Sequence, residues 1–121
     1  MTRWRRVLAE QPVRWRVAYD VEEAVGFAGT GPCRDPVEPT LGELDTIAVS
    51  QAWWRRGVGS VLMSDALASM RHAGFASAVL WTLADYPRGD AFYRRFGWLP
   101  DGRSRDSGRQ VSYGHALTTA A

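Results

Sequence analysis

The chain has 121 residues, of which 45% are hydrophobic and 23% charged, and its net charge is +2. That length suits one domain with a real core and is too short for two, so we expect residues 1–121 to form a single domain. The modest charge does not by itself favour a nucleic-acid partner. No apolar run approaches the roughly 20 residues of a membrane span, and no apolar stretch of an export signal follows the basic start. Cys33, the only cysteine, excludes an internal disulfide and is typical of a reducing compartment, so we expect a cytoplasmic protein.

The start of the chain predicts a short helix. Trp4, Val7 and Leu8 recur at helical spacing, which predicts an amphipathic helix over residues 2–10. Several arginines gather here and just beyond, interleaved with tryptophan: Arg3, Arg5, Arg6, Arg14 and Arg16. They could form a nucleic-acid arm, but we favour the solvated face of a helix and a strand.

A hairpin and a loop follow in the predicted order. Apolar and polar residues alternate over 13–19, as in a half-buried strand, and residues 24–28 are the expected return strand. Three prolines within residues 29–41 predict a loop.

The second half alternates strands with helices. A central strand over 41–49 leads into a glycine-bearing turn and a helix of about 58–73, with Gly74 placed to end it. A mostly apolar strand is expected over 76–83, as when both faces are covered.

The last segments are a helix and a strand. Pro87 suits the first turn of a helix that Gly97 closes. A polar turn over 103–109 and a final strand over 111–117 complete the chain. Helices and strands in this order predict an α/β mixed sheet with helices packed on it.

The turn after the central strand predicts an anion site. Glycines at 57 and 59 let an anionic group approach backbone N–H groups that lack partners at the start of the helix. A dinucleotide fingerprint is excluded because Leu62 stands where its third glycine belongs. A Walker A loop is excluded because the chain contains no lysine.

Two motifs instead resemble the GNAT superfamily of N-acetyltransferases. The first is Gln/Arg-x-x-Gly-x-Gly/Ala, matched at Gly57 and Gly59, with Trp54 at the leading position. The second is Phe-Tyr-x-x-x-Gly-Phe, to which residues 92–98 are similar; Tyr86 stands where the family often carries asparagine. The resemblance spans residues 41–117.

The resemblance implies a mixed, mostly antiparallel sheet flanked by helices, the acyl-CoA N-acyltransferase fold, with the N-terminal strand and helix of the family missing. It also implies acetyl-CoA as the cosubstrate, with its pantetheine arm paired like an added strand to Ile47, Ala48 and Val49. The diphosphate would lie on the amides of the turn, namely Arg55, Arg56, Gly57, Val58, Gly59 and Ser60. The Val49 amide could polarise the thioester carbonyl.

Acetyl transfer to an amine needs a base and an acid. Glu43, in phase with Ile47 and Val49, is our candidate base, with Asp45 as a possible substitute. Tyr93 is our candidate acid for the leaving thiolate, because its ordinary pKa near 10 lies close above that of a thiol. His72 and His115 are not accompanied by other potential metal ligands, so we predict no metal site.

Loss of the N-terminal elements would expose an edge of the sheet, which a homodimer could cover. We therefore predict an N-acetyltransferase that moves an acetyl group from acetyl-CoA to a primary amine by direct attack in a ternary complex. The acceptor, a small molecule or a peptide, is open. The alternatives are a catalytically weak acyl-CoA-binding or interaction module and, less favoured, a nucleic-acid binder.

Overall fold

The computed structural model describes residues 3–7, 14–34 and 37–117. These residues form seven strands, a single 3₁₀ turn and two helices, in the order β1 (Arg3–Val7), β2 (Arg14–Asp20), β3 (Glu23–Arg34), β4 (Val37–Val49), η1 (Gln51–Trp53), α1 (Val58–His72), β5 (Ser77–Leu83), α2 (Pro87–Arg95), β6 (Leu99–Arg105) and β7 (Gln110–Ala116).

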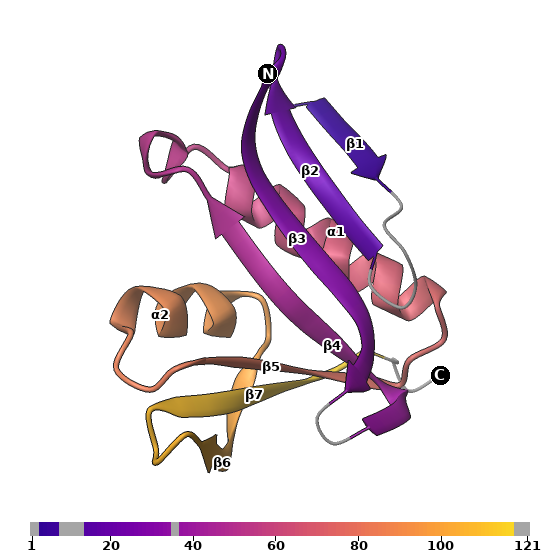
Figure 1. Cartoon of the computed structure of the whole chain (residues 1–121), viewed down its shortest axis with the longest axis vertical. Helices are drawn as coiled ribbons and strands as arrows, with labels where there is room; N and C mark the ends of the chain where they lie inside the picture. Colours follow the sequence, from indigo (N-terminus) through magenta and orange to yellow (C-terminus); the bar gives the residue numbers. More distant parts are fainter. Residues whose placement is uncertain (1–2, 8–13, 35–36, 118–121) are drawn as a thin grey trace.

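The strands form one mixed sheet with the order β1-β2-β3-β4-β5-β7-β6 (Figure 1). Neighbouring strands run antiparallel except for β4 and β5, which are parallel. The predicted fold, a mostly antiparallel mixed sheet flanked by helices, is therefore confirmed.

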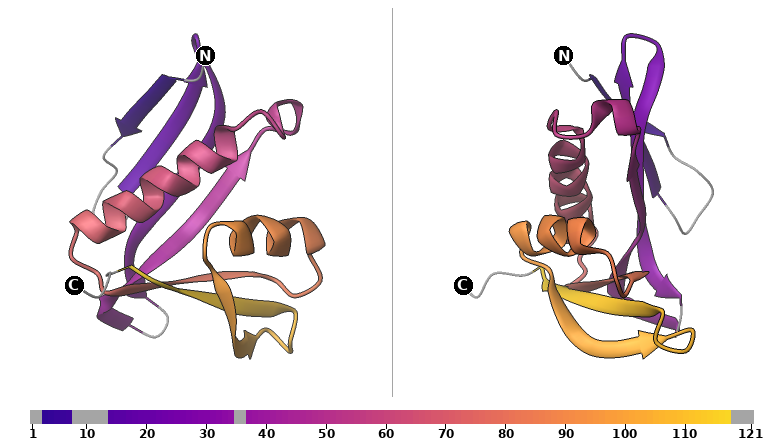
Figure 2. Two further views of the ribbon diagram at one scale, coloured as in Figure 1. Left: turned by 180° about the vertical axis from the view of Figure 1, so that it is seen from behind. Right: turned by 90° about the vertical axis from the view of Figure 1, so that its left-hand side faces the viewer.

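Both helices lie on the same side of the sheet, as the edge-on view in Figure 2 shows. The apolar stripe of α1 is buried against β3 and β4, and it contains the predicted positions Val58, Leu62, Ala66 and Met70. Gly74, in the left-handed region at φ 94°, follows the end of α1 as predicted.

The predicted helix over residues 2–10 is wrong. Residues 3–7 form β1, which pairs antiparallel with β2 from Arg3 opposite Tyr19 to Val7 opposite Trp15. Three apolar residues at helical spacing are a weak signal, and pairing with the free edge of β2 gives this backbone its hydrogen bonds. The rest of the predicted helix lies outside the described residues.

One predicted loop is largely strand, and one predicted turn is shorter than expected. β3 continues to Arg34 and β4 starts at Val37, so most of 29–41 is paired backbone; residues 35–36 lie outside the described part. The β3–β4 register shifts next to Pro32, at the kind of irregularity where a strand tolerates proline. The predicted turn over 103–109 is shorter, because β6 extends to Arg105.

Arg16 departs from the expected solvated face. Its side chain is only 1% exposed, forms an ion pair with Asp65 of α1, and donates to Thr30 Oγ1 at 3.2 Å. A buried charge needs such partners, so Arg16 joins β2 to α1 rather than facing a nucleic acid.

β4 contains a local irregularity beside the predicted functional stretch. Thr46 pairs with Gly29 of β3, whereas Leu44 pairs with the adjacent Thr30, so Asp45 is an extra residue in β4. A bulge of this kind shifts the alternation of side chains by one position.

The bulge changes which residues share a face of β4. Leu44 is buried in the core under α1, and after the bulge it is Ile47 and Val49 that pack against this core. Glu43 alternates with Leu44 and thus lies on the opposite face. The prediction that Glu43 is in phase with Ile47 and Val49 is wrong.

Candidate active site

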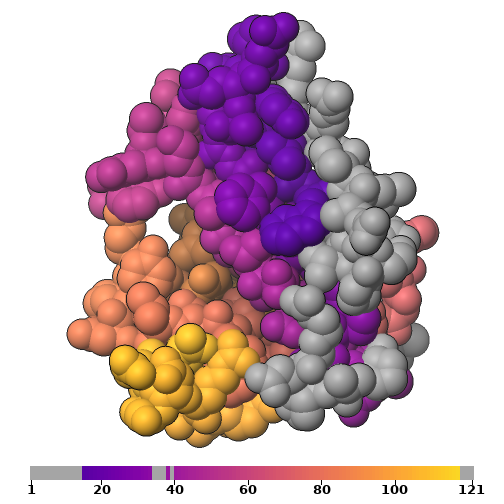
Figure 3. All heavy atoms as spheres, viewed as in Figure 1, coloured from indigo at the N-terminus to yellow at the C-terminus, as the bar shows by residue number. Residues whose placement is uncertain are grey.

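A cavity of about 270 Å³ opens where β4 and β5 diverge. The two strands pair at Leu41–Glu43 and Ser77–Val79, and within the described residues the rest of β4 has no partner strand on that side. The cavity lies between the end of β4, the following turn, the start of α1 and helix α2. Figure 3 shows the hollow in the surface between this turn and α2.

The end of β4 presents backbone groups to the cavity. Ser50 N–H donates to Val25 O at 2.8 Å, and the backbone groups of an antiparallel strand alternate in direction. The N–H and C=O of Ile47 and Val49 therefore point away from β3 and toward the cavity. Those of Ala48 point toward β3, although Ala48 is also a lining residue.

The turn presents the start of α1 to the same cavity. Gly57 is the N-cap residue with φ 87°, a backbone conformation that glycine adopts without strain. No acidic residue stands in the first turn of α1, and no side chain caps it. Its first N–H groups therefore remain available to an anion.

Gly59 lets the two helices approach at the cavity. A Cβ atom at this position would lie 3.3 Å from a ring carbon of Phe92 in α2, tighter than ordinary packing. Arg95 of α2 donates to Ser60 Oγ at 2.9 Å and links the helices at the same point. The second glycine of the motif thus has a packing reason in this fold.

Two predicted cofactor residues do not line the cavity with their side chains. Val58 is 1% exposed and belongs to the core. Arg56 stacks over Trp53, with its Cζ atom 4.3 Å from the ring centroid. The other predicted residues of the turn and of the end of β4 do line it: Ile47, Ala48, Val49, Arg55, Gly57, Gly59 and Ser60.

Tyr93 reaches the cavity from α2. Burial raises the pKa of its phenol, and this effect exceeds the opposing effect of a hydrogen bond with the Thr82 side chain of β5. The side chain packs against the rings of Phe92 and Tyr113, with centroids 5.8 Å and 5.4 Å away. Burial therefore favours the protonated form of Tyr93, and two neighbouring rings pack against its side chain.

Glu43 lies apart from the cavity lining. It is the last β4 residue paired with β5, opposite Val79, so it stands at the point where the two strands separate. Its side chain is half-buried on the face of β4 that α1 does not cover. Asp45, in the bulge, is exposed.

Several lining residues were not among the predicted site residues, and most come from α2: Trp53, Trp54, Tyr86, Arg88, Gly89, Phe92 and Arg95. A helical projection would have found the α2 members. Gly89 precedes Tyr93 by four residues, Arg88 precedes Phe92 by four, and Arg95 follows Phe92 by three, which are the spacings of neighbours on one helix face.

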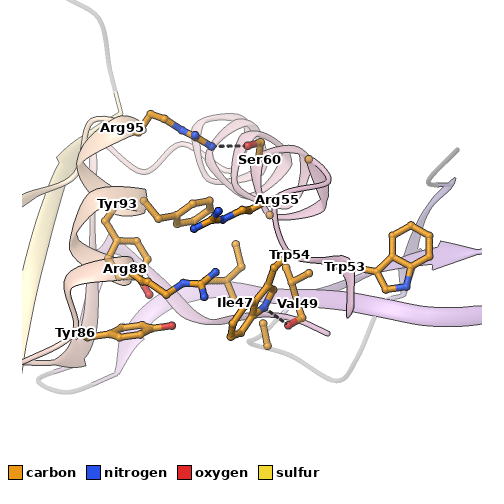
Figure 4. Close-up of a pocket in the computed structure, with 15 residues that line it drawn as sticks. Ile47, Val49, Trp53, Trp54, Arg55, Ser60, Tyr86, Arg88, Tyr93 and Arg95 are labelled. Atoms are coloured by element: carbon orange, nitrogen blue, oxygen red, sulfur yellow. Dashed lines mark hydrogen bonds between the residues drawn. The ribbon is translucent and has the colours of Figure 1, made fainter. Parts of the chain in front are cut away.

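Trp54 occupies the position of the polar residue in the motif. Its indole Nε1–H donates to the Val49 carbonyl at 2.9 Å, and the Cζ atom of Arg88 lies 3.7 Å from the ring centroid. Figure 4 shows the indole between Arg88 and the backbone of β4. Trp54 therefore packs across the turn.

Asp90 accepts a hydrogen bond from Tyr113, whose ring packs against Tyr93 of the cavity lining. Tyr113 Oη donates to Asp90 Oδ1 at 2.6 Å and Arg94 Nε donates at 2.9 Å, and both contacts lower the pKa of Asp90. Burial and the nearby carboxylate raise the pKa of Tyr113 to about 12.

The hydrogen bond between Asp90 and Tyr113 should affect the stability of the protein at low pH. Because the folded-state pKa of Asp90 lies below its unfolded value of about 3.9, its contribution is complete above that value and is lost as pH falls through the folded pKa. We expect Asp90→Asn to remove this part of the pH dependence, measured by urea unfolding between pH 7 and pH 3. Tyr113→Phe should reduce the same pH dependence; an unchanged acid profile in both variants would contradict the assignment.

Neither a metal cluster nor a membrane-spanning helix is found in the described ranges. No group of three or more His, Cys, Asp or Glu side chains there could hold a metal ion. None of the helices there is long and apolar enough to cross a membrane.

A parallel pair of strands that diverges beside an uncapped helix start, within a mostly antiparallel sheet, defines the acyl-CoA N-acyltransferase fold. The model of the acetyltransferase (GNAT) family matches residues 2–98, and the chain belongs to this family. A comparison with curated proteins finds no match.

Solved structures share the fold at low sequence identity. The IAA acetyltransferase from Bacillus cereus is 16% identical with a TM-score of 0.82, covering 96% of this chain and 99% of its own. The PaiA N-acetyltransferase from Thermoplasma acidophilum, in complex with coenzyme A, is 15% identical with a TM-score of 0.74, covering 86% and 60%. The ribosomal-protein-S18-alanine N-acetyltransferase from Escherichia coli is 18% identical with a TM-score of 0.72, covering 93% and 74%.

Proposed function

We propose that this protein transfers the acetyl group of acetyl-CoA to a primary amine by direct attack in a ternary complex. The observation that carries the proposal is the cavity itself. It joins an uncapped helix start, backbone groups of β4 that face no neighbouring strand in the described residues, and a half-buried phenol within one hollow. The same hollow offers an anion site, a strand edge and a proton donor.

The chain would bind acetyl-CoA along this hollow. The amides of Arg55 to Ser60 would hold the diphosphate, and Arg55 would add positive charge. Ile47 and Val49 would pair with the pantetheine arm through the N–H and C=O groups that face the cavity. Ala48 would contribute contact area rather than backbone hydrogen bonds.

Two side chains would move protons. Glu43, or Asp45 in its place, would take a proton from the ammonium form of the acceptor through water, because only the neutral amine has a lone pair to attack with. The Val49 N–H would stabilise negative charge that develops on the thioester oxygen. Tyr93 would donate its phenolic proton to the leaving thiolate.

Glu43 and Tyr93 would then act from different sides of the gap. Both helices cover the side that holds the cavity, whereas Glu43 lies on the other face of β4. An amine that approached from the Glu43 face would meet the thioester across the gap between β4 and β5. We propose a small-molecule or peptide amine as the acceptor and no resident metal.

A weaker, binding-only function is the second candidate, favoured by Trp54. Its indole already uses the Val49 carbonyl, one of the groups that the pantetheine arm would need. We also propose a single cytoplasmic domain that forms a homodimer through the edge at β1. Light scattering during size exclusion tests the dimer.

Thermal melting across a titration of acetyl-CoA tests the cosubstrate, with desulfo-CoA and ATP as controls. A ligand that binds the native state stabilises it by about 2.7 kcal/mol at a concentration 100 times its Kd. We expect a saturable rise in Tm with both CoA species and none with ATP. No rise at millimolar acetyl-CoA would contradict the proposal.

A further inference from the structure

Trp54 links the two walls of the cavity. Its indole bonds to the end of β4 through the Val49 carbonyl, while its ring stacks with Arg88 at the start of α2 (Figure 4). Trp54 is 38% exposed, so the link lies at the mouth of the cavity rather than in the core.

The hydrogen bond removes one backbone group from the cavity wall. The cavity side of β4 ends in the N–H and C=O groups of Ile47 and Val49, and an arm paired to this edge would use them in turn. The indole nitrogen stands 2.9 Å from the Val49 oxygen and occupies one of its two acceptor positions. An arm that paired fully with β4 would therefore compete with Trp54 for this oxygen.

Arg88 makes this competition depend on charge. An exposed stack of a guanidinium on an indole is a weak interaction, and a charge-assisted hydrogen bond to a phosphate contributes more. A phosphate that reaches the cavity therefore attracts Arg88 away from Trp54. The indole then loses the stacking contact that helps to hold it in place. An acyl-pantetheine compound without phosphate offers Arg88 no charged partner to replace the indole.

We propose that Trp54, braced by Arg88, determines the class of acyl donor that this site accepts. Trp54 and Arg88 together hinder the binding of acyl-pantetheine compounds that lack phosphate at the pantetheine site beside Val49. A CoA thioester binds there because its phosphates attract Arg88 away from the indole. The inference rests on the proposed function, since it concerns the same cosubstrate site.

The test compares the Kd of acetyl-CoA and of acetyl-pantetheine by titration calorimetry. Trp54→Phe keeps a ring for Arg88 but removes the only donor of the side chain. We expect it to tighten acetyl-pantetheine by about two- to tenfold, the range of one net hydrogen bond. Acetyl-CoA should tighten by less, because it already displaces the indole with the help of Arg88.

Arg88→Met gives a sharper result, because the two donors should respond in opposite directions. Loss of the brace should tighten acetyl-pantetheine, whereas loss of the phosphate partner should weaken acetyl-CoA by at least severalfold. Trp81→Phe is the matched control. Trp81 carries a comparable stack, with the Cζ atom of Arg105 at 4.3 Å, and it is not a lining residue of the cavity. Thermal melting of each variant checks that it is folded.

The outcomes separate this inference from the proposed function. If no variant and no wild-type protein binds acetyl-CoA, the proposed function fails together with the inference. If the wild-type protein binds acetyl-CoA but Trp54→Phe and Arg88→Met change both donors equally, only the inference is overturned. A shift in the donor ratio by Trp81→Phe as large as that by Trp54→Phe would also overturn it.

Discussion

Replacing Tyr93 with phenylalanine is expected to lower kcat for acetyl transfer by about 10²- to 10⁴-fold, the usual range for a lost general acid. The Kd of acetyl-CoA should stay close to the wild-type value, because the change removes one hydroxyl and leaves the ring in place. The measurement pairs steady-state kinetics with a binding titration. A variant that loses affinity and kcat together would instead assign Tyr93 to binding.

The pH profile supplies a second readout for Tyr93. Burial raises its phenol pKa, so the residue stays protonated, and able to donate, beyond its ordinary value of about 10. The same shift makes it a weaker acid than a free phenol and widens the gap to the thiolate. Loss of activity through ionisation of Tyr93 should therefore begin only above about pH 10, and it should be absent from the phenylalanine variant.

Tyr19→Phe is the matched control for Tyr93. It makes the same chemical change on β2, and Tyr19 is not a lining residue of the cavity. Equal losses of kcat in both variants would show that the hydroxyl of Tyr93 acts through general stability.

Replacing Trp98 with alanine is expected to lower the free energy of unfolding by about 3–5 kcal/mol, as for other large-to-small changes in a core. Trp98 is fully buried, its indole lies 3.3 Å from Met63 Sδ, and its ring meets His115 edge-on at 5.2 Å. Its backbone N–H also donates to the Tyr93 carbonyl at 3.0 Å. The side chain thus joins α1 to β7, and the backbone of the same residue holds the end of α2.

Urea unfolding measures this loss, and an unchanged m-value would show that the two-state transition is preserved. Trp81→Ala is the control, because Trp81 is only half-buried on β5 under Arg105, whose Cζ atom lies 4.3 Å from the ring centroid. We expect a clearly smaller loss there. Equal losses would mean that burial of Trp98 in the shared core is not what stabilises the fold.

Local signals in the sequence predicted the elements whose causes are local. The apolar stripe of α1 repeats over its full length, Gly74 can take a positive φ, and Pro87 suits a first helical turn. The two glycines of the turn and the signature around Tyr93 lie on these elements at fixed spacing. The family and most of the cavity lining could therefore be predicted from the sequence.

Only the tertiary structure decided the features that depend on distant pairing. Residues 3–7 form a strand because the edge of β2 accepts them, and the bulge at Asp45 exists only against β3. That bulge moved Glu43 to the other face of β4, which no periodicity in the sequence could reveal. The contacts of Trp54 depend on the tertiary structure for the same reason: its partners, Val49 and Arg88, come from different elements, and only folding brings them to one indole.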